Sequence, residues 1–201
     1  QTPAARYEDV PLALKGEHQA RNAAVALAAA EAFFGGGAFA ADVVEHAFMS
    51  VSSPGRLEIV RSSPTVVADA AHNPHGAQAT ADALREYFPG RLVGVVGMMA
   101  DKDVEGFLGV LEPVLDAVVV TDIASDRAMD ADELADIAGG VFGDGRVFVE
   151  RNLAEAIDRA AGLAESDDGA PMASPAVVVL GSIQLVAAAR TLMGKPGADG
   201  A

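Results

Sequence analysis

From residue 57 onward, short apolar runs alternate with longer segments of helical periodicity, and this alternation constrains the fold more than any other feature. Six segments have the length and composition of strands: 57–61, 65–69, 92–97, 117–121, 146–149 and 176–181. Five segments have a helical pattern: 74–88, 103–112, 130–139, 152–163 and 183–193. Runs such as Val177–Leu180 are continuously apolar, as expected of strands covered on both faces. The pattern predicts a doubly wound, mostly parallel α/β sheet.

A different pattern precedes this region. Residues 17–34 are rich in Ala, Val, Leu, Asn and Gln and run into three glycines, which predicts a helix with a glycine end. A second helix is predicted over 41–49, and an edge strand over 7–14. The turn residues of 52–56 indicate a domain boundary. A polar surface loop is predicted over 165–175.

Composition limits the partners of the chain. It carries 29 acidic and 14 basic residues, a formal net charge of −15, so we expect it to bind neither nucleic acid nor an anionic membrane. It has no Cys, which excludes disulfides and thiolate metal sites and suits a cytoplasmic location. No apolar run approaches the roughly 20 residues that span a bilayer. Gln1 is not followed by the charged and apolar regions of a signal peptide, and the chain resembles a piece of a longer protein.

Polar residues follow the predicted strands, where ligands bind in an open parallel sheet. After the strand 65–69, Asn73 is a natural N-cap and Pro74 suits the first helical position, so both have a structural explanation. Asp69 and His72 have no such explanation and are expected on the rim of the crevice. There a carboxylate can accept from a ribose hydroxyl, and an imidazole can approach a phosphate or ribose.

Other strand ends carry further candidates. Lys102 is predicted to be a lone ammonium suited to a carboxylate or phosphate, although a solvated lysine is the commoner case. The turn at Ser182 directs backbone N–H groups and a hydroxyl toward any anion. Asp122, Ser125 and Arg127 follow another strand and have no assigned role, whereas Asp130 is expected to cap the next helix.

Three residues before the sheet also stand out. His18 and Asn22 are one helical turn apart and therefore share a face, which could equally be an ordinary exposed polar face. Arg56, delivered by the Pro54–Gly55 turn, could form a bidentate contact with phosphate or be an ordinary interdomain arginine.

Four stretches together resemble a known family. Gly16–Ala24 resembles a G-x-H-Q-x-x-N-A motif, and Ser53–Glu58 is similar to a P-G-R stretch. Asp69–His75 resembles D-x-A-H-N-P, and Gly97–Asp103 resembles G-M-x-x-D-K-D. These motifs belong, in this order, to folylpolyglutamate synthases/dihydrofolate synthases of the Mur ligase superfamily. The resemblance covers essentially residues 1–195.

The resemblance implies a domain organisation and an activity. Residues 1–52 would be the tail of the central ATPase domain, 53–195 the Rossmann-like C-terminal glutamate-ligase domain, and 196–201 a disordered tail. The intact protein would be an ATP-dependent ligase. It would activate a carboxylate of dihydropteroate or a folate as an acyl phosphate, and the amine of L-glutamate would then displace phosphate to give the amide. Its partners would be these small molecules and its own N-terminal domain, and it would be a monomer.

The resemblance also implies roles for the nucleotide-side residues. Asn22 would contact the adenine, with His18 close by. Arg56 would reach the γ-phosphate and help to neutralise its charge. Asp69 would hold the ribose, and His72 would lie beside the nucleotide.

Two residues are assigned to the second substrate by analogy with Mur ligases. Lys102 and Ser182 would hold the carboxylates of the incoming glutamate. Lys102, together with Arg56 and His72, makes up the expected catalytic set.

The chain departs from the family in one large respect. It contains no G-x-x-x-x-G-K-[ST] loop, because Gly194-Lys195 is followed by Pro196. The resemblance places this loop, most of the folate site and the ligands of Mg²⁺ upstream of Gln1. We therefore expect this fragment to be inactive alone and to contain no metal ligands of its own.

Two alternatives remain open. The chain could be the C-terminal domain of another Mur-type ligase that adds an amino acid to a cell-wall precursor. It could instead be a non-catalytic Rossmann-like module that binds a nucleotide or acts as a receiver, with Asp69 as the phosphoacceptor. The sequence does not distinguish dihydrofolate synthesis from polyglutamate extension.

Overall fold

The computed structural model describes residues 1–166 and 174–195, which form two units, Gln1–Pro54 and Gly55–Ala201. The expected tail over 196–201 and most of the polar loop predicted over 165–175 lie outside the described residues.

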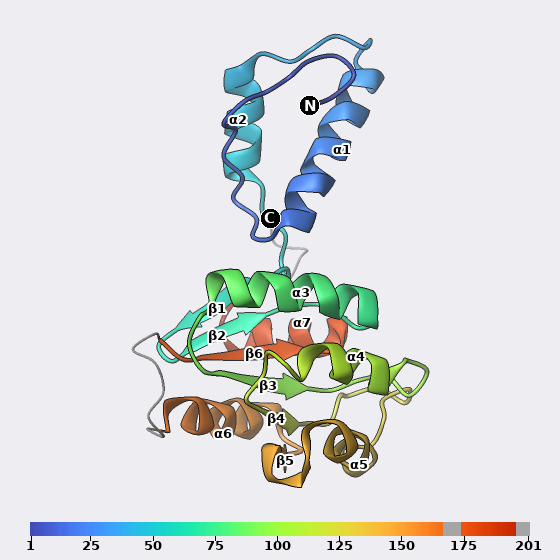
Figure 1. The fold of residues 1–201 in the computed structure, drawn as a ribbon, viewed down its shortest axis with the longest axis vertical. Helices are drawn as coiled ribbons and strands as arrows, with labels where there is room; N and C mark the ends of the chain where they lie inside the picture. The colour runs from blue at the N-terminus through green and yellow to red at the C-terminus, as the bar shows by residue number, and fades with distance from the viewer. Residues whose placement is uncertain (167–173, 196–201) are drawn as a thin grey trace. The chain divides into compact units, whose positions relative to one another are not determined.

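The first unit contains two helices, α1 (Glu17–Phe33) and α2 (Ala41–Ser50), as predicted (Figure 1). The edge strand predicted over 7–14 is wrong, since this segment forms no strand and Asp9 within it has a φ of +54°. The segment is held by the side chain of Tyr7 and by one backbone hydrogen bond, not by the hydrogen bonds of a β-ladder. The Tyr7 hydroxyl donates to the Glu31 carboxylate and accepts from the Phe39 N–H at 2.9 Å, and one backbone bond joins the segment to α2.

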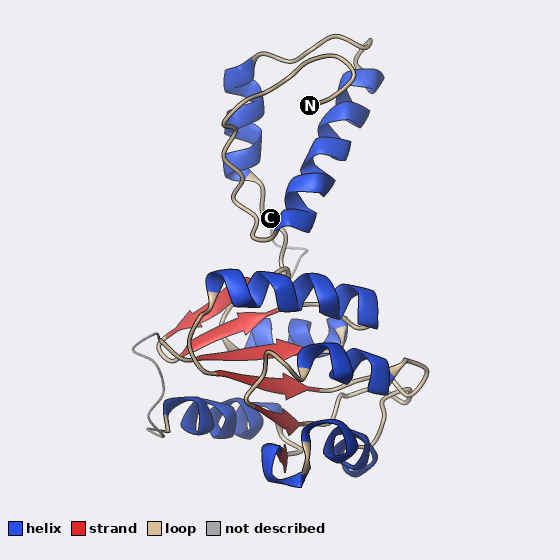
Figure 2. Cartoon of the chain, in the orientation of Figure 1, coloured by secondary structure: helices blue, strands red, loops and turns tan. Residues whose placement is uncertain are grey.

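The second unit is built on the predicted six-stranded sheet (Figure 2), whose strands lie in the order β1-β2-β6-β3-β4-β5 (Figure 1). Its strands are β1 (Glu58–Ser62), β2 (Thr65–Ala68), β3 (Leu92–Val96), β4 (Ala117–Val120), β5 (Val147–Val149) and β6 (Ala176–Leu180). The edge strand β1 pairs antiparallel with β2, and all other neighbours are parallel. The predicted mostly parallel α/β sheet is therefore confirmed.

Five helices cover the sheet on both faces. They are α3 (Pro74–Tyr87), α4 (Val104–Leu111), α5 (Ala131–Phe142), α6 (Leu153–Glu165) and α7 (Ile183–Leu192). One core contains residues of α3, α4 and α5 with one set of strand side chains, and a second core contains residues of α6 and α7 with the alternate set. Because successive strand residues point to opposite faces, β3 and β6 are buried throughout, which explains their continuous apolar runs.

Side-chain caps begin the helices that follow the strands. Asn73 accepts from the Gly76 N–H at 2.8 Å, with Pro74 at the first helical position, as predicted. Asp103 and Asp130 cap α4 and α5 in the same way, and Asn152 caps α6. Each cap accepts a hydrogen bond from a backbone N–H that has no partner within the helix, so each helix begins at a fixed residue.

The chain order of the strands creates a crevice around β6. This strand is inserted between β2 and β3, yet its helix α7 packs on the opposite face from α3 and α4. The loops after β2, β6 and β3 therefore diverge at the carboxyl ends of the strands, toward which the arrows point in Figure 2. A position where neighbouring connections diverge in this way is where open α/β sheets bind ligands.

No helix among the described residues is long and apolar enough to cross a membrane.

Candidate functional site

A cavity of about 210 Å³ lies at the diverging carboxyl ends of the strands. It is lined by His72, Met99, Lys102, Arg127, Gly181, Ser182, Ile183 and Gln184. Three of the residues predicted from the sequence, His72, Lys102 and Ser182, are thus brought together from three different loops. The cavity lining also includes Arg127, to which the sequence assigned no role.

Gly181, directly after β6, is one of the residues that line the cavity. Its φ is +104°, and a Cβ added there would lie 2.6 Å from the carbonyl oxygen of Gly97. Its N–H donates to the Ala71 carbonyl at 2.9 Å. Glycine is therefore required here, because it permits both the backbone conformation and the close approach of two strand ends.

Ser182 begins α7 and is buried. Its hydroxyl accepts from the Gln184 N–H at 3.2 Å and so caps the helix. The same hydroxyl retains a proton that it can donate into the cavity, beside the positive end of the helix dipole. A structural cap and an anion contact are compatible at this residue.

The ring of His72 has one nitrogen fixed by the backbone. Its Nδ1 lies 2.9 Å from the Ala70 carbonyl oxygen. A carbonyl only accepts, so Nδ1 must carry the proton. In the neutral ring, Nε2 then holds the lone pair and can accept a hydrogen bond from a ligand.

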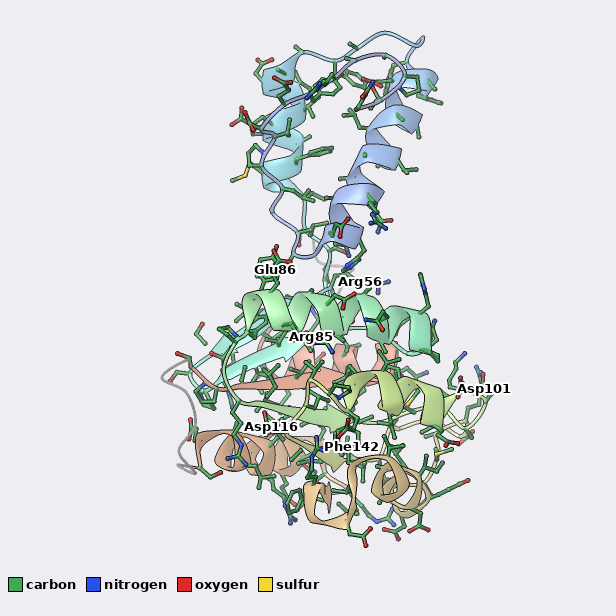
Figure 3. The ribbon with its side chains drawn as sticks, in the orientation of Figure 1. Arg56, Arg85, Glu86, Asp101, Asp116 and Phe142 are labelled. Carbon is green, nitrogen blue, oxygen red and sulfur yellow. The ribbon has the colours of Figure 1, made fainter. Side chains whose placement is uncertain are left out.

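Lys102 is not the lone ammonium that the sequence predicted. Its Nζ lies 3.3 Å from Oδ2 of Asp101, whose Oδ1 accepts from the Arg127 guanidinium at 2.8 Å. Figure 3 shows Asp101 at the edge of the sheet toward which the strands run. The hydrogen bond from Arg127, and then that from Lys102, lowers the pKa of the Asp101 carboxyl. One ionised carboxylate therefore holds two cations at the cavity.

Backbone hydrogen bonds join the two loops that carry these cations. The Ala100 N–H donates to the Arg127 carbonyl and the Met129 N–H to the Met98 carbonyl, each at 2.9 Å. Met99 and Ala128 form an antiparallel bridge between them. Arg127 could not be assigned from the sequence because it follows β4, and only this pairing places it beside the loop after β3.

The sequence predicted that Asp69 lies on the rim of the crevice, and this prediction is wrong. The residue is 4% exposed, and its carboxylate accepts three internal hydrogen bonds. The donors are the Leu57 N–H at 2.9 Å, the Ala71 N–H at 3.0 Å and the Thr80 hydroxyl at 2.8 Å. Leu57 has a φ of +45°, a conformation that is unfavourable for a residue with a side chain. The Asp69 carboxylate stabilises this turn.

The Asp69 contacts determine where Arg56 is presented. Gly55 accepts from the Ala70 N–H at 2.8 Å, and Leu57 donates to Asp69, so the backbone on both sides of Arg56 is joined to the end of β2. The side chain itself is exposed and makes no hydrogen bond or ion pair with the described residues (Figure 3). A fixed backbone with an unengaged guanidinium is suited to contact an anion.

His18 and Asn22 lie in the first unit, on α1, one turn apart as predicted. His18 is half-buried and Asn22 is exposed, with its amide 3.4 Å from the Gln19 side chain.

Asp122 has a structural role. Arg151 makes ion pairs of 3.1 Å with Asp122 and with Asp130, and of 2.7 Å with Asp132. The hydrogen bond from Arg151 lowers the pKa of Asp130, and these carboxylates raise the pKa of Arg151. This network holds the start of α5 and lies apart from the residues that line the cavity.

The described residues do not fit a metal centre, because they contain no group of three or more His, Asp or Glu side chains that could hold an ion. They do fit a phosphate or carboxylate ligand, for which Arg56, Lys102 and Arg127 offer cationic donors.

Comparisons with known proteins agree with this architecture. The Mur ligase, glutamate ligase domain family matches residues 55–182. A dihydrofolate synthase/folylpolyglutamate synthase of Mycobacterium tuberculosis is 49% identical over 199 residues, which is 94% of this chain and 41% of the relative. A crystal structure of a Mycobacterium tuberculosis folylpolyglutamate synthase, complexed with ADP and AMPPCP, superimposes with a TM-score of 0.92 at 48% identity. That match covers 98% of this chain and 44% of the other.

A cell-wall ligase is also similar, over a shorter stretch. The UDP-N-acetylmuramoyl-L-alanyl-D-glutamate–2,6-diaminopimelate ligase 1 of Clostridium acetobutylicum is 36% identical over 124 residues, 58% of this chain and 26% of the relative. The chain thus spans well under half the length of these curated relatives.

Proposed function

The chain belongs to the Mur ligase family, whose glutamate ligase domain it contains, and we propose that it forms the C-terminal part of an ATP-dependent ligase that adds L-glutamate to a folate or dihydropteroate. Within that ligase, the second unit binds the incoming amino acid and presents cationic groups to the nucleotide. Its small-molecule partners are ATP, L-glutamate and the pterin-bearing substrate. Its protein partner is the N-terminal part of the same polypeptide, and the ligase acts as a monomer.

The observation that carries this proposal is the charge of the cavity. The whole chain has a formal charge of −15, yet the cavity lining includes Lys102 and Arg127 and, among the described residues, no Asp or Glu. Two cations and a helix start that line the same cavity of a strongly acidic protein form a place for an anionic ligand. An amino-acid carboxylate fits this cavity.

We assign the α-carboxylate of glutamate to Lys102 and Ser182. The ammonium of Lys102 supplies charge, and the Ser182 hydroxyl supplies a directed hydrogen bond beside the first turn of α7. Holding the α-carboxylate fixes the neighbouring amine relative to the activated acyl group, and such positioning contributes strongly to amide formation.

The nucleotide side uses Arg56 and His72. ATP supplies the phosphoryl group that activates the substrate carboxylate. Arg56 is assigned to the γ-phosphate, and His72 to the nucleotide through Nε2, as acceptor when neutral and as donor when protonated. Asn22 and His18 are assigned to the adenine side. Asp69 is left out of the ligand contacts, because its carboxylate is buried and engaged internally.

We propose no magnesium site in this chain. The described residues offer no cluster for it, and we place its ligands, with the phosphate-binding loop, in the N-terminal part of the ligase. The fragment is accordingly proposed to bind ligands but not to catalyse ligation alone.

Two alternative functions are disfavoured. The match to the cell-wall ligase covers 58% of the chain, against 94% for the folate enzyme. A receiver domain requires an accessible phosphoacceptor, and Asp69 is 4% exposed.

The test is a titration of the 201-residue chain, followed by amide chemical shifts, with L-glutamate, meso-diaminopimelate and ATP. We expect saturable shifts around Lys102 and Ser182 with L-glutamate, and their loss in Lys102→Gln. Lys15→Gln is the matched control, because it removes the same charge from the other unit. Stronger binding of meso-diaminopimelate would favour the cell-wall alternative, and a wild-type chain that does not respond to L-glutamate would contradict the amino-acid site.

A further inference from the structure

Arg56 lies in a turn whose backbone is constrained on both sides. Its neighbours Gly55 and Leu57 both have a positive φ, of +72° and +45°. A residue with a side chain rarely adopts this conformation, so the surrounding contacts must hold the turn in place. The Asp69 carboxylate holds the Leu57 side, as described above. The Gly55 side is held by a separate pair of side chains.

The first member of this pair is Glu58, which begins β1. Its Oε2 accepts from the Gly55 N–H at 2.8 Å, so the side chain reaches back to the start of the turn. The same oxygen accepts from Nε of Arg190, in the last turn of α7, also at 2.8 Å. The side chains of Arg190 and Glu58 are 11% and 23% exposed. Solvent and salt therefore screen this ion pair less than an exposed one.

Helix α7 also packs directly against the turn. A Cβ added at Gly55 would lie 2.7 Å from Cγ1 of Val186, one helical turn before Arg190. Val186 itself is buried in the core that α6 and α7 form with the sheet. One face of α7 thus contacts the turn twice, by packing at Val186 and through the carboxylate of Glu58 at Arg190.

These contacts fix the backbone but leave the guanidinium of Arg56 unengaged among the described residues. We propose that Glu58, held by Arg190, is a positioning residue that presents Arg56 to the phosphate chain of a nucleotide. This inference rests on the proposed contact of Arg56 with the γ-phosphate and adds residues that act through Arg56. A turn that is already ordered loses little further backbone entropy when an anion binds, whereas a loosened turn must be ordered by the ligand.

The test uses inorganic triphosphate as the probe, because it carries the phosphate chain without the adenine. The 201-residue chain and its variants are titrated, with the amide shifts of Gly55 and Leu57 as the readout. We expect Arg56→Gln to weaken binding by about tenfold or more, as for a lost charge-assisted contact. Glu58→Ala should weaken it by about fivefold or more, the cost of ordering one further backbone residue. Glu58→Gln keeps an oxygen for the Gly55 N–H and should bind within about threefold of wild type.

Two measurements separate positioning from a general loss of structure. In an Arg56→Gln background, Glu58→Ala should cause no further loss of affinity, because its effect passes through Arg56. The ¹⁵N order parameter of the Arg56 amide should fall in Glu58→Ala from about 0.85 to below about 0.6. The matched control is Glu112→Ala, which breaks another partly buried pair, with Arg146, in the same unit. It should lower the melting temperature without changing the affinity for triphosphate.

Each contrary result has its own meaning. An unchanged affinity in Glu58→Ala overturns the positioning role and leaves the phosphate contact of Arg56 intact. A loss of the same size in the wild-type and Arg56→Gln backgrounds also overturns it, because Glu58 then acts by another route. A wild-type chain that does not respond to triphosphate, or an Arg56→Gln variant that binds it equally well, overturns the phosphate contact and the positioning role together. Thermal unfolding of each variant distinguishes lost binding from lost folding.

Discussion

The role of Asp69 leads to a prediction that separates a structural carboxylate from a ligand-binding one. Replacing Asp69 by Ala removes the acceptor of three hydrogen bonds, two of them from backbone N–H groups. A buried donor left without a partner costs about 1–3 kcal/mol. The Leu57 and Ala71 donors and the released turn therefore predict a loss of about 4 kcal/mol in the free energy of unfolding.

Asp69→Asn should cost less, for a specific reason. The amide oxygen can take the place of Oδ1 and still accept from Ala71 and Thr80, but the amide nitrogen then faces the Leu57 N–H and cannot accept from it. The loss should be about 2 kcal/mol. Thr80→Val removes a single side-chain donor and leaves no buried N–H unpaired, so it should cost about 1 kcal/mol.

Urea unfolding followed by circular dichroism measures these differences, provided that the slope with denaturant is unchanged. A loss below about 1 kcal/mol for Asp69→Ala would refute the structural assignment. Asp69 would then be available as the ribose ligand that the sequence suggested. ATP titration of Asp69→Asn provides the complementary readout, because a structural role predicts that the variant still binds while folded.

Three further predictions concern the cavity. Gly181→Ala should lower the free energy of unfolding by about 2 kcal/mol or more, measured in urea, because its Cβ would lie 2.6 Å from a backbone oxygen at a φ of +104°; a neutral effect would contradict the described turn. The neutral ring of His72 should be protonated at Nδ1, which long-range ¹H–¹⁵N spectra detect, and a proton on Nε2 would contradict the bond to Ala70. The lowered pKa of Asp101 means that its ion pairs stabilise the fold above the pKa of the unfolded chain and are lost as pH falls through the folded value. Carboxyl ¹³C titration should therefore give a low midpoint for Asp101 that rises in Arg127→Gln, and an unchanged midpoint would refute the cause given.

The sheet could be predicted from the sequence because its signals are local. Strands β2 to β6 are short, mostly apolar runs, and each α-helix of the second unit starts with its own side-chain cap, such as Asn73 or Asp103. The strand prediction for residues 7–14 was wrong because the apolar alternation of this segment resembles a strand, while a tertiary contact of Tyr7 decides its conformation. No pattern within eight residues contains that contact.

The site could be predicted only in part. In open parallel sheets, ligands bind at the carboxyl ends of the strands, and this rule predicted that His72, Lys102 and Ser182 lie near one another. The rule depends on strand direction alone. The rule does not say how deep a side chain lies or what it pairs with. It therefore placed Asp69 on the rim, although the turn at Leu57 buries it, and it could not identify the ion pair of Lys102 with Asp101.

The overall charge and the local charge of this protein act in opposite directions on an anionic substrate. A net charge of −15 repels an anionic ligand at distances comparable to the Debye length, about 8 Å at physiological ionic strength. Closer than that, the cavity wall dominates, and Lys102 and Arg127 outnumber the Asp101 carboxylate that holds them. Asp101 neutralises part of this charge, but it also keeps both side chains directed at the same place when no ligand is bound. The proposed amino-acid site would therefore depend on preorganised short-range contacts rather than on attraction by the whole molecule.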